Sequence, residues 1–233
     1  MNALGLTTGW CAGNSASLEV ELPALLRAWL ALARPAALPP SAAADDIAGS
    51  GVAEEADWAD VQASLGGDGD AYGRLVRRHQ QAVGVYLWRF TRDRNHREEL
   101  VHDVFVEAYF SLSKYARRGS FGGWLKCLAT RLGYRYWQRR DRARREVSWP
   151  EEQIPARPDD QAEAARQACE TVHRLLADLS PRDRLVMTLF YLEQCTIADI
   201  AQRTGWSETA VKVQAHRARK RLQKICERKG IEP

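Results

Sequence analysis

Apolar positions along most of the chain recur every three or four residues, which is the spacing of one face of an α-helix. Between residues 56 and 145 this pattern predicts four helical stretches, at 58–65, 71–90, 96–115 and 121–145. Asp70 and Ser120 are placed to act as N-caps of the second and the fourth stretch. No run of alternating apolar residues demands a strand, so an all-α fold is expected.

Helical spacing resumes after a proline-rich gap and continues to the end of the chain. One helix is expected to end near Leu179, and another to run from Pro181 to Gln194. Ser180 followed by Pro181 is a favourable helix start, because serine caps well and proline suits the first helical position. Two further helices follow, separated by a tight turn.

The last two helices have the form of a helix-turn-helix. Gly205 lies where the turn needs a residue that tolerates positive φ, and Ser207 is placed to cap the second helix. The inner face of the first helix is assigned to Ile197, Ile200 and Ala201. In the second helix one apolar stripe is formed by Val211, Ala215, Ala218, Leu222 and Ile225.

The opposite side of this second helix is basic and polar. A recognition helix places such side chains against base edges and phosphates in the major groove. The alternative is a basic amphipathic helix at a bundle surface, or one that binds an acidic protein. The turn and the cap favour DNA, and the candidate contacts are Ser207, Thr209, Lys212, Val213, His216, Arg217 and Lys220.

The stretch 96–115 shows a second face that is unusual for a solvated surface. Its broad apolar face runs from Leu100 to Leu112, yet acids lie together with Val106 and Phe110 on the opposite side. Such a mixed surface indicates a protein partner. A helix that is buried on both sides is the competing interpretation.

The stretch 121–145 mixes aromatic side chains with arginines. Aromatic rings surrounded by cations are suited to hold unstacked bases and a phosphate backbone. Core packing of Tyr134 and Trp137 is the competing explanation. The candidates beyond the apolar stripe are Arg131, Tyr134, Arg135, Trp137, Arg139 and Arg140.

Charge and composition divide the chain of 233 residues into four parts. Residues 1–55 are rich in Ala, Pro and Gly, so we expect a largely flexible extension there. Two basic helical domains, 56–145 and 165–229, are joined by a flexible acidic linker at 146–164. The net charge is only +4, but two separate basic blocks suggest a polyanionic partner such as nucleic acid.

Several classes of function find little support. The five cysteines are scattered without a C-x-x-C, which predicts reduced thiols and a cytoplasmic protein. The histidines lack metal-ligand spacing, and no P-loop, G-x-S-x-G or H-E-x-x-H occurs. We therefore expect no metal, no cofactor and no enzymatic activity. Arg27, Arg34 and several prolines interrupt the most apolar stretch, so no membrane span is expected.

Three stretches in order resemble a known family. They are "EELVHDVFVEAY", "GSFGGWLKCLAT" and "LSPRDRLVMTLFYLEQCTIADIAQRTGWSETAVKVQAHRARKRL". Together with their surroundings they cover about two thirds of the chain and resemble the extracytoplasmic-function (ECF) sigma factors of bacterial RNA polymerase. The helix-turn-helix alone is weakly specific, whereas the ordered trio is strongly specific.

The resemblance implies a promoter-specificity factor that binds core RNA polymerase through the large-subunit coiled coil and the flap. It implies that the first domain recognises and melts the −10 element and that the second reads the −35 element. An anti-sigma protein is a further partner that the family allows. The polymerase-binding positions would be Glu99, Leu100, Asp103, Val106, Glu107 and Phe110, and the strand-opening segment would include Ser120, Phe121 and Trp124.

The chain departs from the family at three positions of the first domain. His102 stands where the family usually has Gln, Arg131 where Asn is frequent, and Arg135 where an acid is frequent. The main alternative function is a stand-alone helix-turn-helix regulator that binds duplex DNA without a polymerase.

Overall fold

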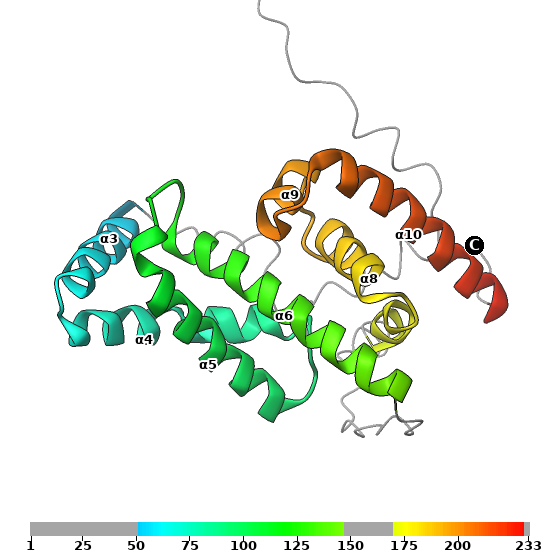
Figure 1. Ribbon diagram of the computed structural model, residues 1–233, viewed down its shortest axis with the longest axis horizontal. Helices are drawn as coiled ribbons and strands as arrows, with labels where there is room; N and C mark the ends of the chain where they lie inside the picture. Colours follow the sequence, from blue (N-terminus) through cyan, green and yellow to red (C-terminus); the bar gives the residue numbers. More distant parts are fainter. Residues whose placement is uncertain (1–50, 147–169, 231–233) are drawn as a thin grey trace, which may run out of the picture.

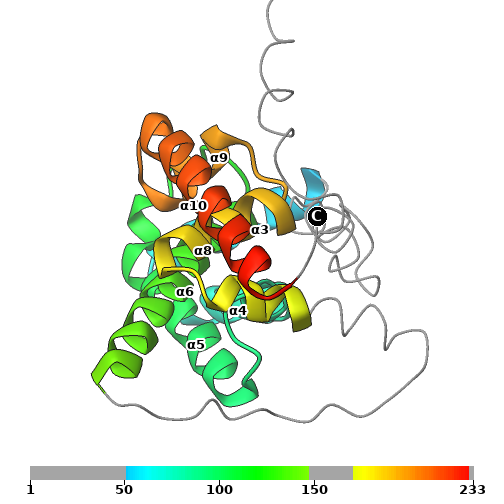
Figure 2. The same cartoon turned by 90° about the vertical axis from the view of Figure 1, so that its right-hand side faces the viewer.

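The computed structural model describes residues 51–146 and 170–230, and within these ranges the chain is helical, without strands. The all-α prediction is therefore confirmed for the described part of the protein. Figures 1 and 2 show two groups of helices lying side by side, with α6 passing between them. The helices of the first group are α3 (Gly51–Leu65), α4 (Gly69–Leu87), α5 (Arg94–Ser111), η2 (Leu112–Lys114) and α6 (Phe121–Glu146).

The second group of helices begins with a helix at 170–177 and ends with the second helix of the helix-turn-helix. One expected helix, from Pro181 to Gln194, is divided into an α-helical part and a π-helical turn. The π-helical turn ends at Leu192, so the expected end of this helix at Gln194 is wrong by two residues. The remaining elements are α8 (Pro181–Met187), η3 (Thr188–Leu192), α9 (Ile197–Thr204) and α10 (Glu208–Arg228).

Short polar side chains fix where the helices begin. Asp68, not Asp70, caps α4, because its carboxylate accepts hydrogen bonds from the backbone N–H groups of Asp70 and Ala71 at 2.9 and 3.2 Å. Helix α5 begins at Arg94, two residues earlier than expected, since Asp93 caps it. The predicted caps Ser180 and Ser207 are confirmed.

Helix α3 begins at Gly51, inside the stretch that was expected to belong to the flexible extension. Its acids explain why it is held, because Asp57 and Asp60 are buried against basic residues of α4. Arg78 pairs with both carboxylates, and Arg74 donates to Asp60 at 2.8 Å. His79 belongs to the same network, with its Nε2 atom 2.9 Å from Asp57 Oδ2. Residues 1–50 and the linker after Glu146 lie outside the described residues.

The core of the first group is formed where α4, α5 and α6 pack together. Leu75, Leu87, Leu100, Phe121 and Leu125 are fully or almost fully buried there. Because each comes from the apolar stripe of its helix, hydrophobic burial accounts for the arrangement. The hydroxyl groups of Tyr86 and Thr130 form a hydrogen bond inside this core, with their oxygens 2.7 Å apart.

Helix α6 approaches the end of α4 closely at Gly133. A Cβ added there would lie 2.3 Å from the ring of Phe90, which is itself buried. We expect Gly133→Ala to lower the free energy of unfolding by about 1–3 kcal/mol in urea denaturation, because the ring has no room to move. Gly84→Ala is the control, since its added Cβ would lie 3.8 Å from Val101. It should be neutral or stabilise by about 0.5–1 kcal/mol, and equal losses in both variants would contradict the packing described.

The second group of helices has an apolar cluster of its own. It joins Leu175, Leu176 and Met187 to Leu222 and Ile225 of α10. Asp183 is fully buried beside it and accepts hydrogen bonds from Ser180, Gln214 and Arg221. This carboxylate therefore ties the start of α8 to the middle of α10.

Candidate nucleic-acid interface

The turn before α10 has the geometry that the sequence predicts. Gly205 adopts φ +78°, a left-handed conformation that favours glycine, and its N–H bonds to Ala201 O at 2.8 Å. A capping box formed by Thr196 and Asp199 starts α9. The Thr196 hydrogen bonds lower the pKa of Asp199. Local capping thus fixes both ends of the short helix that supports α10.

Helix α10 exposes the side that was predicted to face DNA. Val211, Ala215, Ala218, Leu222 and Ile225 are buried, as the stripe predicts. Val213 is 45% exposed, so its side chain is available for an external contact. The other candidates that the structure leaves exposed are Ser207, Thr209, Lys212, His216, Arg217 and Lys220.

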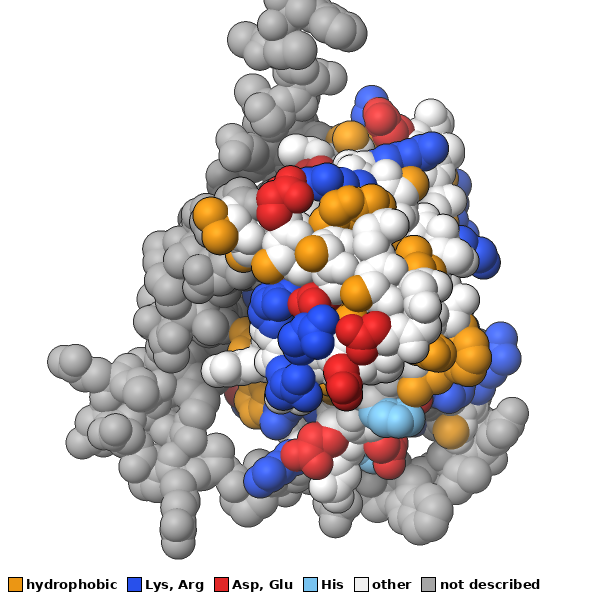
Figure 3. Space-filling model, turned by 90° about the vertical axis from the view of Figure 1, so that its left-hand side faces the viewer, with side chains coloured by type: hydrophobic (Ala, Val, Ile, Leu, Met, Phe, Trp, Pro, Cys, Tyr) orange, Lys and Arg blue, Asp and Glu red, His pale blue; other side chains and the backbone are white. Residues whose placement is uncertain are grey.

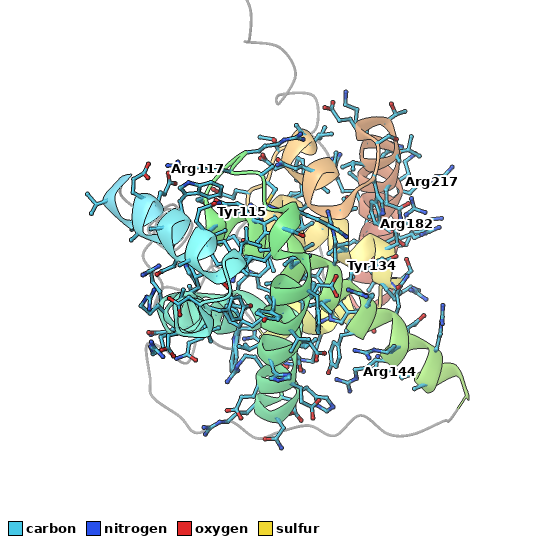
Figure 4. All side chains as sticks on the ribbon, turned by 60° about the vertical axis from the view of Figure 1, so that its left-hand side comes forward. Tyr115, Arg117, Tyr134, Arg144, Arg182 and Arg217 are labelled. Atoms are coloured by element: carbon cyan, nitrogen blue, oxygen red, sulfur yellow. The ribbon has the colours of Figure 1, made fainter. Side chains whose placement is uncertain are left out.

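Arg182 is a further cation near this face that sequence reasoning missed. Its guanidinium stacks over the ring of Trp206 in the turn, 4.5 Å from the centroid. Figure 4 shows Arg182 and Arg217 projecting on the same side of the molecule. No sequence signal marked Arg182, because its role depends on α8 packing beside the turn.

Helix α6 carries its arginines outward and its aromatic rings inward. Arg131, Arg135, Arg139 and Arg140 are exposed, whereas Tyr134 is half-buried. Trp137 is only 4% exposed, and its indole N–H donates to Phe90 O at 2.7 Å. Core packing, the competing explanation, therefore describes Trp137 in this structure. The exposed arginines still form a basic strip along the helix.

The segment before α6 is organised by an aromatic cluster. Ser120 caps the helix, accepting from Gly123 N–H at 3.0 Å, and Phe121 is 1% exposed. Trp124 is half-buried and packs against Tyr115, whose hydroxyl donates to Gly119 O at 2.7 Å. Phe121 thus supports this segment from the core and does not present its ring to solvent. Figure 4 shows Tyr115 and Arg117, both missed from the sequence, beside α3.

The outer face of α5 combines exposed acids with exposed apolar side chains. Phe110 is 79% exposed and Val106 39%, and Tyr109, which sequence reasoning missed, lies beside them. Glu99, Asp103 and Glu107 are exposed as well. Leu100, assigned to the same surface, is instead buried in the core, because it belongs to the opposite stripe of the helix. On the face drawn in Figure 3, hydrophobic side chains lie exposed between charged ones.

The two groups of helices share an interface that is partly polar. Helix α6 packs against α8 and α9, and Glu193 pairs there with Arg89 of the first group. Burial raises the pKa of Cys195 to about 11 and lowers the pKa of Lys126. Burial alone would lower the pKa of Arg203, but Tyr86, Cys195 and Glu193 outweigh it and raise the pKa. The charged side chains of Arg89, Glu193 and Arg203 therefore lie between the two groups of helices with little exposure to solvent.

Two kinds of site are not found among the residues that the structure describes. No group of three or more His, Cys, Asp or Glu side chains there is arranged to hold a metal ion. None of the helices within 51–146 and 170–230 is long and apolar enough to cross a membrane.

Comparison with known proteins gives two family matches in the expected order. Residues 75–143 match the model described as Sigma-70 region 2, and residues 169–222 match Sigma-70, region 4. The RNA polymerase sigma factor YlaC of Bacillus subtilis is 29% identical over 66% of this chain and 91% of its own length. The ECF RNA polymerase sigma factor BldN of Streptomyces coelicolor is 26% identical over 71% of this chain, which spans 64% of that relative.

A solved structure, that of CnrH in complex with the cytosolic domain of CnrY, is 22% identical with a TM-score of 0.48. It covers 74% of this chain and 97% of that chain. The two family models together match more than half of the sequence, and they fall on the two groups of helices described above. The chain belongs to the sigma-70 family of RNA polymerase sigma factors and is of the ECF type.

Proposed function

We propose that this sigma factor binds core polymerase through the outer face of α5 and reads promoter DNA with α10 and α6. The observation that carries the proposal is that one chain exposes both a basic helical face and an acidic helical face that includes apolar side chains. Helix α10 presents an exposed basic face, and α5 presents Val106 and Phe110 among exposed acids. The domains assigned at 56–145 and 165–229 would then act as separate binding units joined by the linker.

The −35 contact is assigned to the exposed side of α10. Lys212 and Arg217 can donate to guanine acceptors, and Val213 can contact a thymine methyl group. His216 lies on the same exposed side and offers a ring nitrogen to a base edge. Arg182 and Lys220 are suited to phosphates, because they flank this surface.

The −10 contact is assigned to α6 and the segment before it. Arg131, Arg135, Arg139 and Arg140 can follow the backbone of a separated strand. Tyr134 and Trp124 are half-buried rings that can stack on unpaired bases. Ser120 and Phe121 fix the start of α6, and Trp137 supports the helix from its buried side.

This proposal describes a protein that acts by binding and has no catalysis of its own. A tether between two DNA-binding units raises the effective concentration for the second contact once the first is made. We place this action in the cytoplasm, together with core polymerase and promoter DNA. An anti-sigma protein would act by covering one of these surfaces.

Footprinting on promoter DNA tests the proposal against the stand-alone regulator. We expect protection of both promoter elements only when core polymerase is present with the protein. Full protection of a palindromic site by the protein alone would instead identify a conventional regulator.

A further inference from the structure

Helix α3 packs beside the segment that joins η2 to α6, residues 115–120 (Figure 4). The guanidinium of Arg117 lies over the ring of Trp58, 5.3 Å from its centroid, and pairs with Glu55, which is also on α3. Tyr115 packs edge-on against the same indole, with ring centroids 6.2 Å apart. Because α3 precedes the part of the chain that matches Sigma-70 region 2, the family match does not account for these contacts.

The backbone at Arg117 is strained. Its φ is +51°, a left-handed conformation that costs a residue other than glycine about 1–3 kcal/mol. The hydroxyl group of Tyr115 donates to Gly119 O at 2.7 Å and so ties the two ends of this turn together. Glycine would adopt the same conformation without the cost. The side chain of Arg117 is therefore the feature of this position that needs a functional explanation.

The ion pair between Glu55 and Arg117 is exposed and is therefore easily replaced. The two side chains are 67% and 43% exposed. Exposed pairs of this kind contribute about 0.2–1 kcal/mol, because water screens the attraction and both side chains lose freedom. A phosphate group offers the same guanidinium a charge-assisted contact that can be bidentate. An anion that binds at Arg117 would therefore displace Glu55 at little cost.

The charges around Arg117 favour an anion. On α3, Asp57 and Asp60 are buried and paired with arginines of α4. The other two acids of this helix are Glu54 and Glu55. The cations outnumber these two acids, and those exposed in the stretch before α6 are Lys114, Arg117 and Arg118.

We infer that Arg117 binds a phosphate of the separated promoter strand, with Trp58 orienting the guanidinium and Glu55 occupying the place of the phosphate until the strand binds. This inference rests on the proposed function and adds α3 to the surface assigned to the −10 strand. Stacking on an indole ring leaves the N–H donors at the edge of a guanidinium available to an acceptor. Tyr115 contacts both Trp58 and Trp124, so one aromatic ring separates the phosphate site from the proposed base-stacking site.

Binding of oligothymidylate to the holoenzyme tests the inference, because a phosphate contact does not depend on the base sequence. The probe has about 12 nucleotides, and core polymerase without the protein gives the background. Arg117→Gln should weaken binding about two- to tenfold at low salt, which corresponds to the loss of one hydrogen-bonded contact. The slope of log affinity against log salt should become shallower by about 0.7, the value for one phosphate of a single strand.

Glu55→Gln should change the affinity for the same probe in the opposite direction. Removing the competing carboxylate should tighten binding about two- to fivefold, the range that an exposed ion pair allows. The double variant should bind as weakly as Arg117→Gln alone, because the carboxylate competes only through that arginine. Glu98→Gln is the matched control, since Glu98 forms an exposed pair with Arg94 on α5, and it should change the affinity by less than about twofold.

The outcomes separate this inference from the proposed function. If Arg117→Gln kept both the affinity and the salt slope, Arg117 would not be a phosphate contact and the inference would be wrong. If Glu55→Gln weakened binding, the ion pair would hold the segment in place without competing with the strand, which also overturns the inference. If the unchanged holoenzyme bound the probe no better than core polymerase alone, the −10 surface of the proposed function would fall instead. Thermal unfolding confirms that each variant is folded.

Discussion

Replacing Phe110 with alanine is expected to weaken binding to core polymerase by about 30-fold or more while leaving the fold intact. Phe110 is 79% exposed on α5, so little of its ring contributes to the protein's own core. A large aromatic ring at the centre of an interface is the kind of residue whose removal costs about 2 kcal/mol or more. Titration of labelled protein with core polymerase measures the loss, and thermal unfolding confirms that the variant is folded.

Leu65→Ala is the matched control for this variant. Leu65 is also an exposed apolar residue, but it lies at the end of α3 and not on α5. It should change polymerase affinity by less than about twofold, as a surface substitution outside an interface does. Equal affinities for Phe110→Ala and the unchanged protein would remove α5 from the polymerase interface.

Replacing Arg217 with alanine should relax −35 recognition and leave polymerase binding unchanged. Arg217 is exposed on α10 and a bidentate contact to guanine adds about 1–3 kcal/mol of discrimination, which is roughly 5- to 150-fold. The measurement compares duplexes with the native and a substituted −35 element at fixed salt. The ratio of the two affinities should fall toward one, because the side chain that distinguishes the bases is gone.

Lys224→Ala controls for the loss of a positive charge on the same helix. Lys224 is exposed and lies seven residues further along α10, about 10 Å toward its C-terminus. A recognition helix reads bases with its N-terminal part, so this variant should keep the base preference. If Lys224→Ala reduced the ratio as much as Arg217→Ala, or if Arg217→Ala also lost polymerase binding, the assignment would be contradicted.

Local signals in the sequence predicted local structure well. Ser180 and Ser207 cap helices as expected, and Gly205 takes positive φ, since each depends on a few neighbouring residues. The start of α4 was missed because Asp68 and Asp70 are both good N-caps two residues apart. Only the backbone hydrogen bonds to Asp68 decide between them.

The candidate contacts were predictable where one face of a helix meets solvent. On α10 a single stripe is buried, so its outward residues followed from the spacing alone. On α6 the same reasoning could not decide whether Trp137 stacks on bases or packs in the core. A second layer of helices buries it, and that contact joins residues distant in sequence. Leu100 and Phe121 were placed at binding surfaces by family resemblance, which marks positions along a helix without saying which side is buried.

Transcription reconstituted from core polymerase, this protein and genomic promoter fragments tests the central claim most directly. The expected result is a transcript with one defined start, which requires the protein and disappears when either promoter element is substituted. The absence of any start that depends on the protein, with core polymerase shown to be active with another sigma factor, would contradict the account.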